Sequence, residues 1–324
     1  MSHYCTDRVL RRDLVRPRRF LTPTRAISPV NRQWPNGSTL SIAFIGGTEP
    51  QRAVVRSCAV EWTKYANLRL DFRPGLPAAI RVAFDPKDGA GSYVGLDCLE
   101  VPANVPTMNL AWVDRAVVLH ELGHALGLAH EHQNPRGGIR WNEAAVIADL
   151  GGPPNYWDEA TVRHNVLDRY ALDQVVGTEF DAKSIMLYSF PPEWTLDGFS
   201  APWNEAISAG DAAFVGSARM YPRTVPAAAR LPVAQSTAGA ISARGEMDEW
   251  EFEVAAAGAH VVETAGATDV VMALYRGGEF VASDDDSGRG RNARIEAHLT
   301  PGVHRLTVRH FSIGTGPYRV VAWS

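Results

Sequence analysis

The stretch HELGHALGLAH, residues 120–130, decides how the rest of the sequence is interpreted. Apolar residues at helical spacing predict a helix that ends at Gly127, so His120 and His124 lie on one helical face. Two imidazoles at this spacing can bind one metal ion. Gly127 allows a left-handed turn, which can bring His130 to the same ion as a third ligand. Three protein ligands leave one position of a zinc ion open, as in catalytic zinc sites and unlike structural ones.

Glu121 follows the first histidine directly, so it is too close along the helix to share the ligand face. Its carboxylate can instead reach a water beside the metal. Zinc lowers the pKa of such a water toward neutrality, and a neighbouring carboxylate can take its proton and pass it to a leaving amine. These residues therefore predict metal-assisted hydrolysis with Glu121 as the general base.

The composition places the chain among globular proteins. Its 324 residues, 45% hydrophobic and 21% charged, predict one large or two medium domains with a real core. A net charge of −4 gives no reason to expect nucleic acid as a partner, and no apolar run approaches the length of a membrane span. The N-terminus lacks the apolar stretch of a secretory signal, so we expect a cytoplasmic protein, with export by a non-classical route as the alternative. We also expect a monomer.

The three cysteines are too few for a disulfide-built scaffold. Cys58 and Cys98 are expected to be buried thiols, and one bridge between them is the alternative.

Four segments are expected along the chain. Residues 1–33 form an Arg-rich arm, residues 34–223 an α+β catalytic domain, residues 224–238 a linker rich in Ala and Pro, and residues 239–324 a small β-sandwich. Within the second segment, residues 132–206 are expected to be irregular. The expected strands are 40–44, 68–72, 80–84, 92–95 and 107–112, and the expected helices are 50–66, 114–127, 142–150, 157–167 and 211–220.

Residues 120–130 resemble the signature of the metzincin metallopeptidases, and Glu131 as the next residue makes them similar to the astacin family. Residues 184–188, SIMLY, resemble the Ser-x-Met-His-Tyr turn of astacins, with Leu187 in place of a histidine that is not a ligand. The resemblance covers residues 34–221. It implies a zinc endopeptidase with a twisted mixed sheet, helices and an irregular lower subdomain, acting on proteins or peptides. A cell-wall peptide amidase and a non-catalytic zinc-containing binding protein are the alternatives.

The resemblance also implies roles for residues around the metal. Met186 would form the apolar floor under the three imidazoles. Tyr188 would bind zinc at rest and swing away to stabilise the oxyanion. Residues 190–194 are expected to shape the pocket beyond the scissile bond. His132 is expected to be a surface histidine or a support for a ligand, since the third-ligand position is already filled.

A strand at the rim of the site resembles the substrate-binding strand of astacins. It contains Ser92, Tyr93, Val94 and Gly95. The resemblance implies that this edge pairs with an extended substrate through main-chain hydrogen bonds.

The glutamate that matches Glu131 binds the amino group of the mature N-terminus in astacins, so the resemblance implies a zymogen. Cleavage would lie upstream of Trp34, and Arg25–Ala26 is one candidate bond. Before cleavage, Cys5 or Asp7 could occupy the open zinc position, because thiolates and carboxylates both bind zinc. A disordered tail is the alternative.

The C-terminal segment resembles the pre-peptidase C-terminal domains of bacterial secreted proteases, so we expect a bacterial protein. Asp284, Asp285 and Asp286 could bind calcium through carboxylate oxygens. A solvated acidic hairpin is the favoured interpretation of these three residues.

Overall fold

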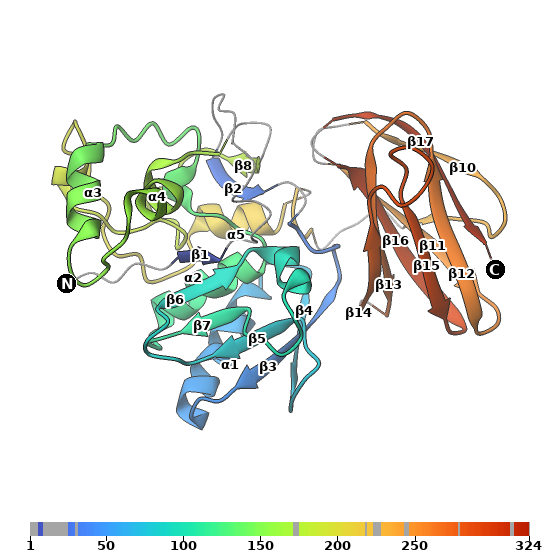
Figure 1. The fold of residues 1–324 in the computed structure, drawn as a ribbon, viewed down its shortest axis with the longest axis horizontal. Coiled ribbons are helices and arrows are strands. Elements are labelled where there is room, and N and C mark those ends of the chain that lie inside the picture. Colours follow the sequence, from blue (N-terminus) through green and yellow to red (C-terminus); the bar gives the residue numbers. More distant parts are fainter. Residues whose placement is uncertain are drawn as a thin grey trace. The chain divides into compact units, whose positions relative to one another are not determined.

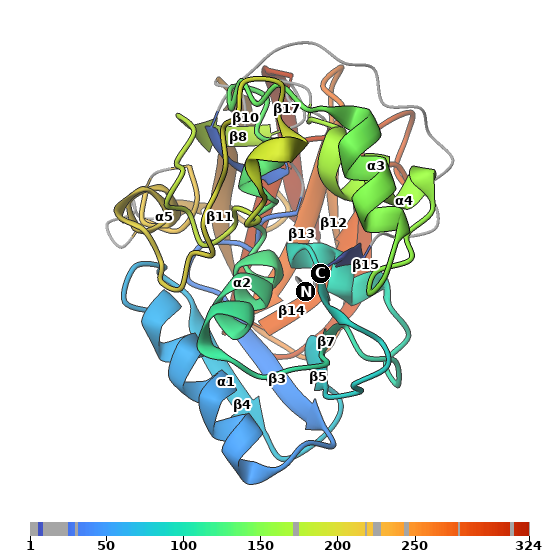
Figure 2. The same cartoon turned by 90° about the vertical axis from the view of Figure 1, so that its left-hand side faces the viewer.

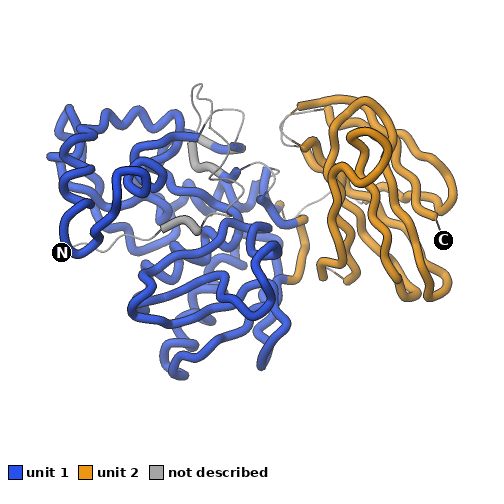
Figure 3. The backbone as a smooth tube through the Cα atoms, in the orientation of Figure 1, with its two compact units in different colours: residues 1–34, 40–221 blue, residues 35–39, 222–324 orange. Residues whose placement is uncertain are grey.

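The fold comes from a computed structural model that describes residues 6–8, 25–29, 32–170, 175–217, 219–222, 228–242, 246–277, 279–311 and 314–323. The chain divides into two compact units (Figure 3). The first unit contains residues 1–34 and 40–221, and the second contains residues 35–39 and 222–324. The short segment Pro35–Thr39 therefore belongs to the C-terminal unit, which the sequence did not indicate.

The first unit is built on a mixed six-stranded sheet (Figure 1). Three neighbouring strands, β3, β5 and β7, run parallel, and β6 runs antiparallel to β7. At one edge β1 pairs in parallel with β6, and at the other edge lies β4. In sheet order the strands are β1 (Thr6–Arg8), β6 (Ala90–Tyr93), β7 (Met108–Leu110), β5 (Ile80–Ala83), β3 (Thr39–Ile45) and β4 (Arg69–Arg73).

Two helices, α1 (Glu49–Trp62) and α2 (Arg115–Ala125), pack against each other beside this sheet (Figure 2). Thr48 and Gln51 form a capping box that satisfies backbone donors at the start of α1. Trp62, fully buried, donates its Nε1–H to the carbonyl of Leu119 at 2.9 Å and so fixes the two helices together. Among the described residues, no helix has the length and apolarity needed to cross a membrane.

The rest of the first unit is irregular, as predicted. It contains short helices and a two-stranded sheet in which β2 pairs with β8. The predicted closing helix 211–220 is wrong in its bounds, because α5 ends at Val215 and Gly216 caps it. The elements are η2 (Gly95–Glu100), η3 (Glu131–Gln133), α3 (Glu143–Gly151), α4 (Glu159–Val162), the π-helix η4 (Arg163–Leu167), η5 (Pro192–Trp194), α5 (Ala209–Val215), β2 (Arg25–Pro29) and β8 (Val175–Thr178).

The second unit is an all-β sandwich, which confirms that part of the predicted fold. One sheet has the order β10-β17-β12-β15 and the other β14-β13-β16-β11-β9. Trp250 in the core donates its Nε1–H to the hydroxyl of Tyr318 at 2.8 Å, joining the two sheets. The strands are β9 (Ala229–Arg230), β10 (Thr237–Ile241), β11 (Met247–Val254), β12 (Gly258–Ala265), β13 (Val270–Arg276), β14 (Glu279–Asp284), β15 (Arg294–Leu299), β16 (Gly302–His310) and β17 (Gly316–Trp323).

The structure differs from the linker expected at residues 224–238. β9 pairs in parallel with β11, and Leu231 is 1% exposed within the sandwich core. The sandwich therefore begins before residue 239, because the Ala- and Pro-rich composition conceals a short strand followed by a core leucine.

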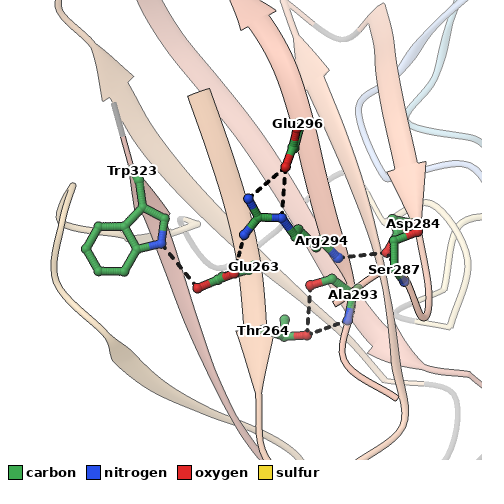
Figure 4. Close-up of polar contacts among 8 residues, drawn as sticks. All are labelled: Glu263, Thr264, Asp284, Ser287, Ala293, Arg294, Glu296 and Trp323. Carbon is green, nitrogen blue, oxygen red and sulfur yellow. Dashed lines mark hydrogen bonds and ion pairs between the residues drawn. The ribbon is translucent and has the colours of Figure 1, made fainter. Parts of the chain in front are cut away.

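Charged residues on β12 and β15 form the polar network drawn in Figure 4. Arg294 lies between Glu263 and Glu296, with N–O distances of 2.8 and 2.7 Å. Asp284 accepts the backbone N–H groups of Ser287 at 3.0 Å and Arg294 at 2.7 Å (Figure 4). Asp284 thus stabilises the turn that follows β14, and calcium binding by residues 284–286 stays an untested expectation.

Candidate metal centre

The helix α2 positions the first two histidines deep in the first unit. It begins where the Asp114 carboxylate accepts the backbone N–H of Val117 at 2.9 Å. Residues 116–125 are all buried, so the helix is fixed on every side. It ends at a turn in which Gly127 has a φ of +99° and donates its N–H to the carbonyl of His124 at 2.8 Å. This left-handed turn reverses the chain and brings His130 back toward the helix, as predicted.

The three imidazoles converge on one point. His124 Nε2 lies 3.1 Å from both His120 Nε2 and His130 Nε2, and one ligand nitrogen from each ring lies within 4.8 Å of the others. A tetrahedral zinc ion with Zn–N bonds of about 2.0–2.1 Å holds its nitrogens about 3.3 Å apart. The spacing of the three nitrogens therefore fits a single zinc ion.

Backbone carbonyls set the tautomers of two of these rings. His120 Nδ1 lies 2.7 Å from the carbonyl of Ile185, and His124 Nδ1 lies 2.9 Å from the carbonyl of Leu128. Because a carbonyl can only accept, each Nδ1 carries the hydrogen and each Nε2 directs a lone pair into the cluster. Lone pairs that face each other at this distance repel unless a cation lies between them. The donor set is thus that of a metal site, with zinc as the ion that it fits.

The turn at residues 184–188 lies against the ligand helix, as the resemblance implied. Met186 is 2% exposed, and a Cβ added to Gly123 would collide with its sulfur. The backbone N–H of Glu131 donates to the carbonyl of Met186 at 2.9 Å. The glycine between the two ligands on α2 therefore makes room for the thioether that packs beneath them.

Asp211, at the start of α5, anchors this turn and was missed by the sequence analysis. Its carboxylate accepts hydrogen bonds from the hydroxyl of Ser184 at 2.6 Å, the backbone N–H of Ile185 at 2.8 Å and that of Ser208 at 3.0 Å. Burial raises the pKa of Asp211 above its usual value, while these hydrogen bonds lower it. A Ser residue three positions before an Asp, ahead of an apolar run, is a capping-box pattern that could have identified it.

The two predicted catalytic side chains lie at the cluster. Glu121 is fully buried next to His120 on α2. The ring of Tyr188 lies 4.4 Å from the ring of His130 and 6.1 Å from that of His120. Whether Tyr188 also binds zinc stays a prediction.

His132 is buried and not a surface histidine. Its Nε2 lies 2.8 Å from the carbonyl of Asn165, and its ring lies 4.3 Å from the ring of Tyr188. His132 therefore packs against the tyrosine as a support and lies outside the ligand set.

The rim strand β6 is the second strand of the sheet, because β1, an N-terminal segment of the same chain, pairs with it. Ser92 and Tyr93 are in β6, Val94 follows it, and Gly95 begins η2 with a φ of +51°. β1 pairs with β6 in the register Thr6↔Gly91, Asp7↔Ser92 and Arg8↔Tyr93. The hydrogen-bonding edge predicted for substrate is thus used by the N-terminal segment. Cys5 lies outside the described residues, and only the backbone of Asp7 is described.

Glu131 is buried beneath the site, and only one of its two carboxylate oxygens accepts hydrogen bonds from described residues. Oε1 accepts from the Asn134 amide at 3.0 Å and from the backbone N–H of Asp181 at 2.9 Å. Oε2 has no hydrogen-bond partner among the described residues. Burial is the main cause that raises the pKa of Glu131, to about 8.

A pocket borders the cluster, but residues 190–194 do not form it. It is lined in part by His120, Glu121, Trp203 and Asn204. Phe190 and Trp194 are instead 3% and 1% exposed in the hydrophobic core. The aromatic residues of this segment thus pack inward, and the expectation that residues 190–194 shape the pocket beyond the scissile bond stays a prediction.

The cysteine thiols are separate from the site. Cys58 and Cys98 are both buried and free, so the bridge considered as the alternative is not formed.

Comparisons with known proteins agree with this geometry. The family model described as Astacin, a family of peptidases, matches residues 26–193, more than half of the chain. The structure of myroilysin is 38% identical with a TM-score of 0.59, and the match covers 61% of this chain and 100% of that chain.

Two further relatives are more distant. Tolloid-like protein 1 from Mus musculus is 26% identical over 174 residues, which are 52% of this chain and 15% of that protein. The chain is also similar to the pre-peptidase C-terminal domain of a collagenase from Bacillus anthracis, at 17% identity and a TM-score of 0.28, over 31% of this chain and 98% of that chain. With a family match over more than half of its length and a histidine cluster of the required geometry, the chain belongs to the astacin family of peptidases.

Proposed function

We propose that the chain is a zinc-dependent endopeptidase that hydrolyses peptide bonds of protein substrates. The observation that carries this proposal is the convergence of three imidazole nitrogens within 4.8 Å of one another, beside a buried glutamate and a tyrosine. A purely structural zinc site needs neither of the last two side chains.

The residues divide the chemistry among them. A zinc ion held by His120, His124 and His130 supplies a Lewis acid that polarises a carbonyl and makes a nearby water more acidic. Glu121 takes a proton from that water and passes it to the leaving nitrogen. Tyr188 donates a hydrogen bond to the oxygen on which negative charge develops. Met186 keeps the floor of the site apolar.

Replacement of Glu121 by Gln tests this proposal. Because no ligand is lost, Glu121→Gln is expected to keep its zinc and to lose at least about 100-fold in kcat/KM on casein or a quenched peptide. Glu253→Gln, at an exposed position of β11 in the second unit, is the matched control and is expected to retain wild-type activity.

Wild-type turnover that survives complete removal of zinc by a chelator would contradict the proposed chemistry. A wild-type protein that binds zinc yet cleaves no protein would favour the binding-protein alternative. Release of peptides from peptidoglycan without cleavage of casein would favour the amidase.

We also propose that the N-terminal arm keeps the enzyme latent. Pairing of β1 with β6 takes the edge that an extended substrate would need, so both cannot bind at once. Cys5 and Asp7 then remain the candidates for the open zinc position. The double variant Cys5→Ser, Asp7→Ala is expected to be active before any cleavage, and unchanged low activity of the uncut variant would count against the idea.

Glu131 supports removal of the arm as the activating step. Its Oε2 atom, which has no hydrogen-bond partner among the described residues, could accept a hydrogen bond from a new ammonium group. The resulting ion pair would offset the cost of burying the carboxylate. β2, which contains the candidate bond Arg25–Ala26, contacts the short helix η3 that contains Glu131. N-terminal sequencing of the active species is expected to begin near Ala26. An active species that begins at Met1 would argue against this maturation.

A further inference from the structure

A pocket beside the histidine cluster has a lining that selects for one class of side chain. The empty space at this pocket is about 390 Å³, a figure that includes the open solvent at its mouth. Its walls include Trp112 and Trp203, together with the aliphatic side chains of Val117, Ile185 and Leu187. His120 and Glu121 lie at the same pocket, so whatever occupies it lies next to the reacting groups.

The polar groups of the pocket do not favour an anionic occupant. Among the described residues that line it, none is Lys or Arg, and Glu121 supplies a negative charge. The amide nitrogen of Asn204 donates to the carbonyls of Ala182 at 3.1 Å and Ser184 at 2.9 Å. Both of its N–H groups are therefore used. A carboxylate entering the pocket would find neither a Lys or Arg side chain nor an unused Asn204 N–H among the described lining residues to offset the loss of its hydration.

The two residues that follow Trp203 are both held by hydrogen bonds. Asn204 is fixed to the turn beneath the metal ligands. The carbonyl of Glu205 accepts a hydrogen bond from the Arg115 guanidinium at the start of α2. Arg115 is itself paired with Glu61 at 2.6 Å. The pocket is thus preformed in the chain and does not depend on a ligand to order it.

We propose that this pocket binds the substrate side chain directly after the scissile bond and selects a large apolar residue there. This inference rests on the proposed endopeptidase function. Glu121 borders the pocket and delivers its proton to the leaving nitrogen, so the residue that contains this nitrogen is the one whose side chain enters. Removal of that side chain's apolar surface from water, against two indole rings, favours Leu or Phe over Ala, Asp or Lys.

Quenched fluorescent peptides that differ only at this residue test the selectivity. With the zinc-loaded active protein, kcat/KM for Leu or Phe is expected to exceed that for Ala by about 10-fold or more, and that for Asp and Lys by more. Equal rates for Leu and Ala, or fastest cleavage before Asp or Lys, would overturn this inference and leave the endopeptidase function standing. Failure to cleave any peptide and casein as well would overturn both.

Two substitutions of Trp203 test whether this pocket determines the selectivity. Trp203→Ala is expected to reduce the Leu-to-Ala ratio of kcat/KM several-fold, because half of the indole wall is removed. Trp203→Lys is expected to raise cleavage before Asp relative to Leu by about 10-fold, because it supplies a cation. Trp203 is 46% exposed, so neither change should prevent folding.

The matched controls are Trp323→Ala and Trp323→Lys in the second unit, where the tryptophan is 40% exposed. Both are expected to keep the wild-type ratios. Unchanged kcat/KM ratios between peptides in both Trp203 variants, with zinc content retained, would show that this pocket does not determine the specificity.

Discussion

The carboxylate of Asp211 accepts a hydrogen bond from the backbone N–H of Ile185 at 2.8 Å. The carbonyl of Ile185 lies 2.7 Å from Nδ1 of His120. Asp211 therefore fixes the first metal ligand through one intervening residue, Ile185. Residues that orient metal ligands in this way typically change metal affinity by about 10- to 100-fold when they are replaced.

Asp211→Asn is therefore expected to raise the zinc dissociation constant by about 10- to 100-fold, measured by competition with a chelator of known affinity. The amide offers one acceptor oxygen where the carboxylate offers two, so the turn at residues 184–188 loses part of its anchor. Asp197→Asn, at an exposed turn of the same unit, is the control. Equal zinc affinity in a folded Asp211→Asn protein would show that the anchor does not reach the metal.

Two glycines with positive φ allow the cost of backbone strain to be compared with the cost of a steric collision. Gly95 and Gly46 have φ values of +51° and +81°. A Cβ at Gly95 would collide with the carbonyl oxygen of Arg32, whereas nothing lies within 4 Å of one at Gly46.

Replacement by Ala is expected to cost about 1–2 kcal/mol of unfolding free energy at Gly46, from strain alone. At Gly95 a further loss of about 1–3 kcal/mol is expected from the collision. Urea denaturation of both variants measures the difference. Similar losses in the two proteins would mean that the segment at Arg32 moves aside at little cost.

Removal of zinc should destabilise one unit and not the other. All three histidines lie in the first unit, and a ligand that binds only the folded state stabilises it by about 4 kcal/mol at roughly 1,000 times its dissociation constant. Calorimetry with a chelator is expected to lower the transition of the first unit by on the order of 10 °C and to leave that of the sandwich unchanged. An equal shift of both transitions, or of neither, would contradict this assignment.

The buried thiols predict a loss of stability at alkaline pH. Burial raises the pKa of Cys58 from 9.0 to about 11 and that of Cys98 to about 12. The unfolded chain releases these protons from about pH 9, while the folded chain retains them. Their stabilising contribution is thus complete below about pH 9 and is lost as the pH rises toward about 11 and 12, by up to about 1.4 kcal/mol per pH unit for each thiol.

Urea titrations between about pH 8 and pH 10.5 measure this slope. Cys98→Ala is expected to make it shallower than in the wild-type chain, whatever the variant's stability at neutral pH. Identical slopes would show that Cys98 keeps its proton equally well in the unfolded state.

The metal ligands could be predicted because short-range geometry determines their placement. Helical periodicity aligns His120 with His124, and one glycine turn returns His130, so no long-range contact is needed. The strands around them follow from alternating apolar residues, and the sandwich follows from short strands at regular spacing.

The parts that could not be predicted depend on contacts between distant or irregular segments. Trp203 reaches the pocket because Asn204 and Glu205 are tied to residues about 20 and 90 positions away, which leaves no periodic pattern. β14 has no clear apolar face, because its residues alternate between partly buried and exposed, so its pattern does not identify it as a core strand. Asp211 showed only a capping pattern, which gives no hint of the turn that its carboxylate holds.

The segment Pro35–Thr39, which belongs to the second unit, has a consequence for the order in which the protein is completed on the ribosome. Asn36 donates its amide to the carbonyl of Pro222 at 2.9 Å, and its own carbonyl accepts from Arg305 at 2.7 Å. These partners are synthesised 186 and 269 residues later, so neither hydrogen bond can form before then. Truncation after residue 221 therefore does not yield the first unit alone. The shortened chain still contains Asn36, which belongs to the second unit, but it has lost both hydrogen-bond partners of that residue.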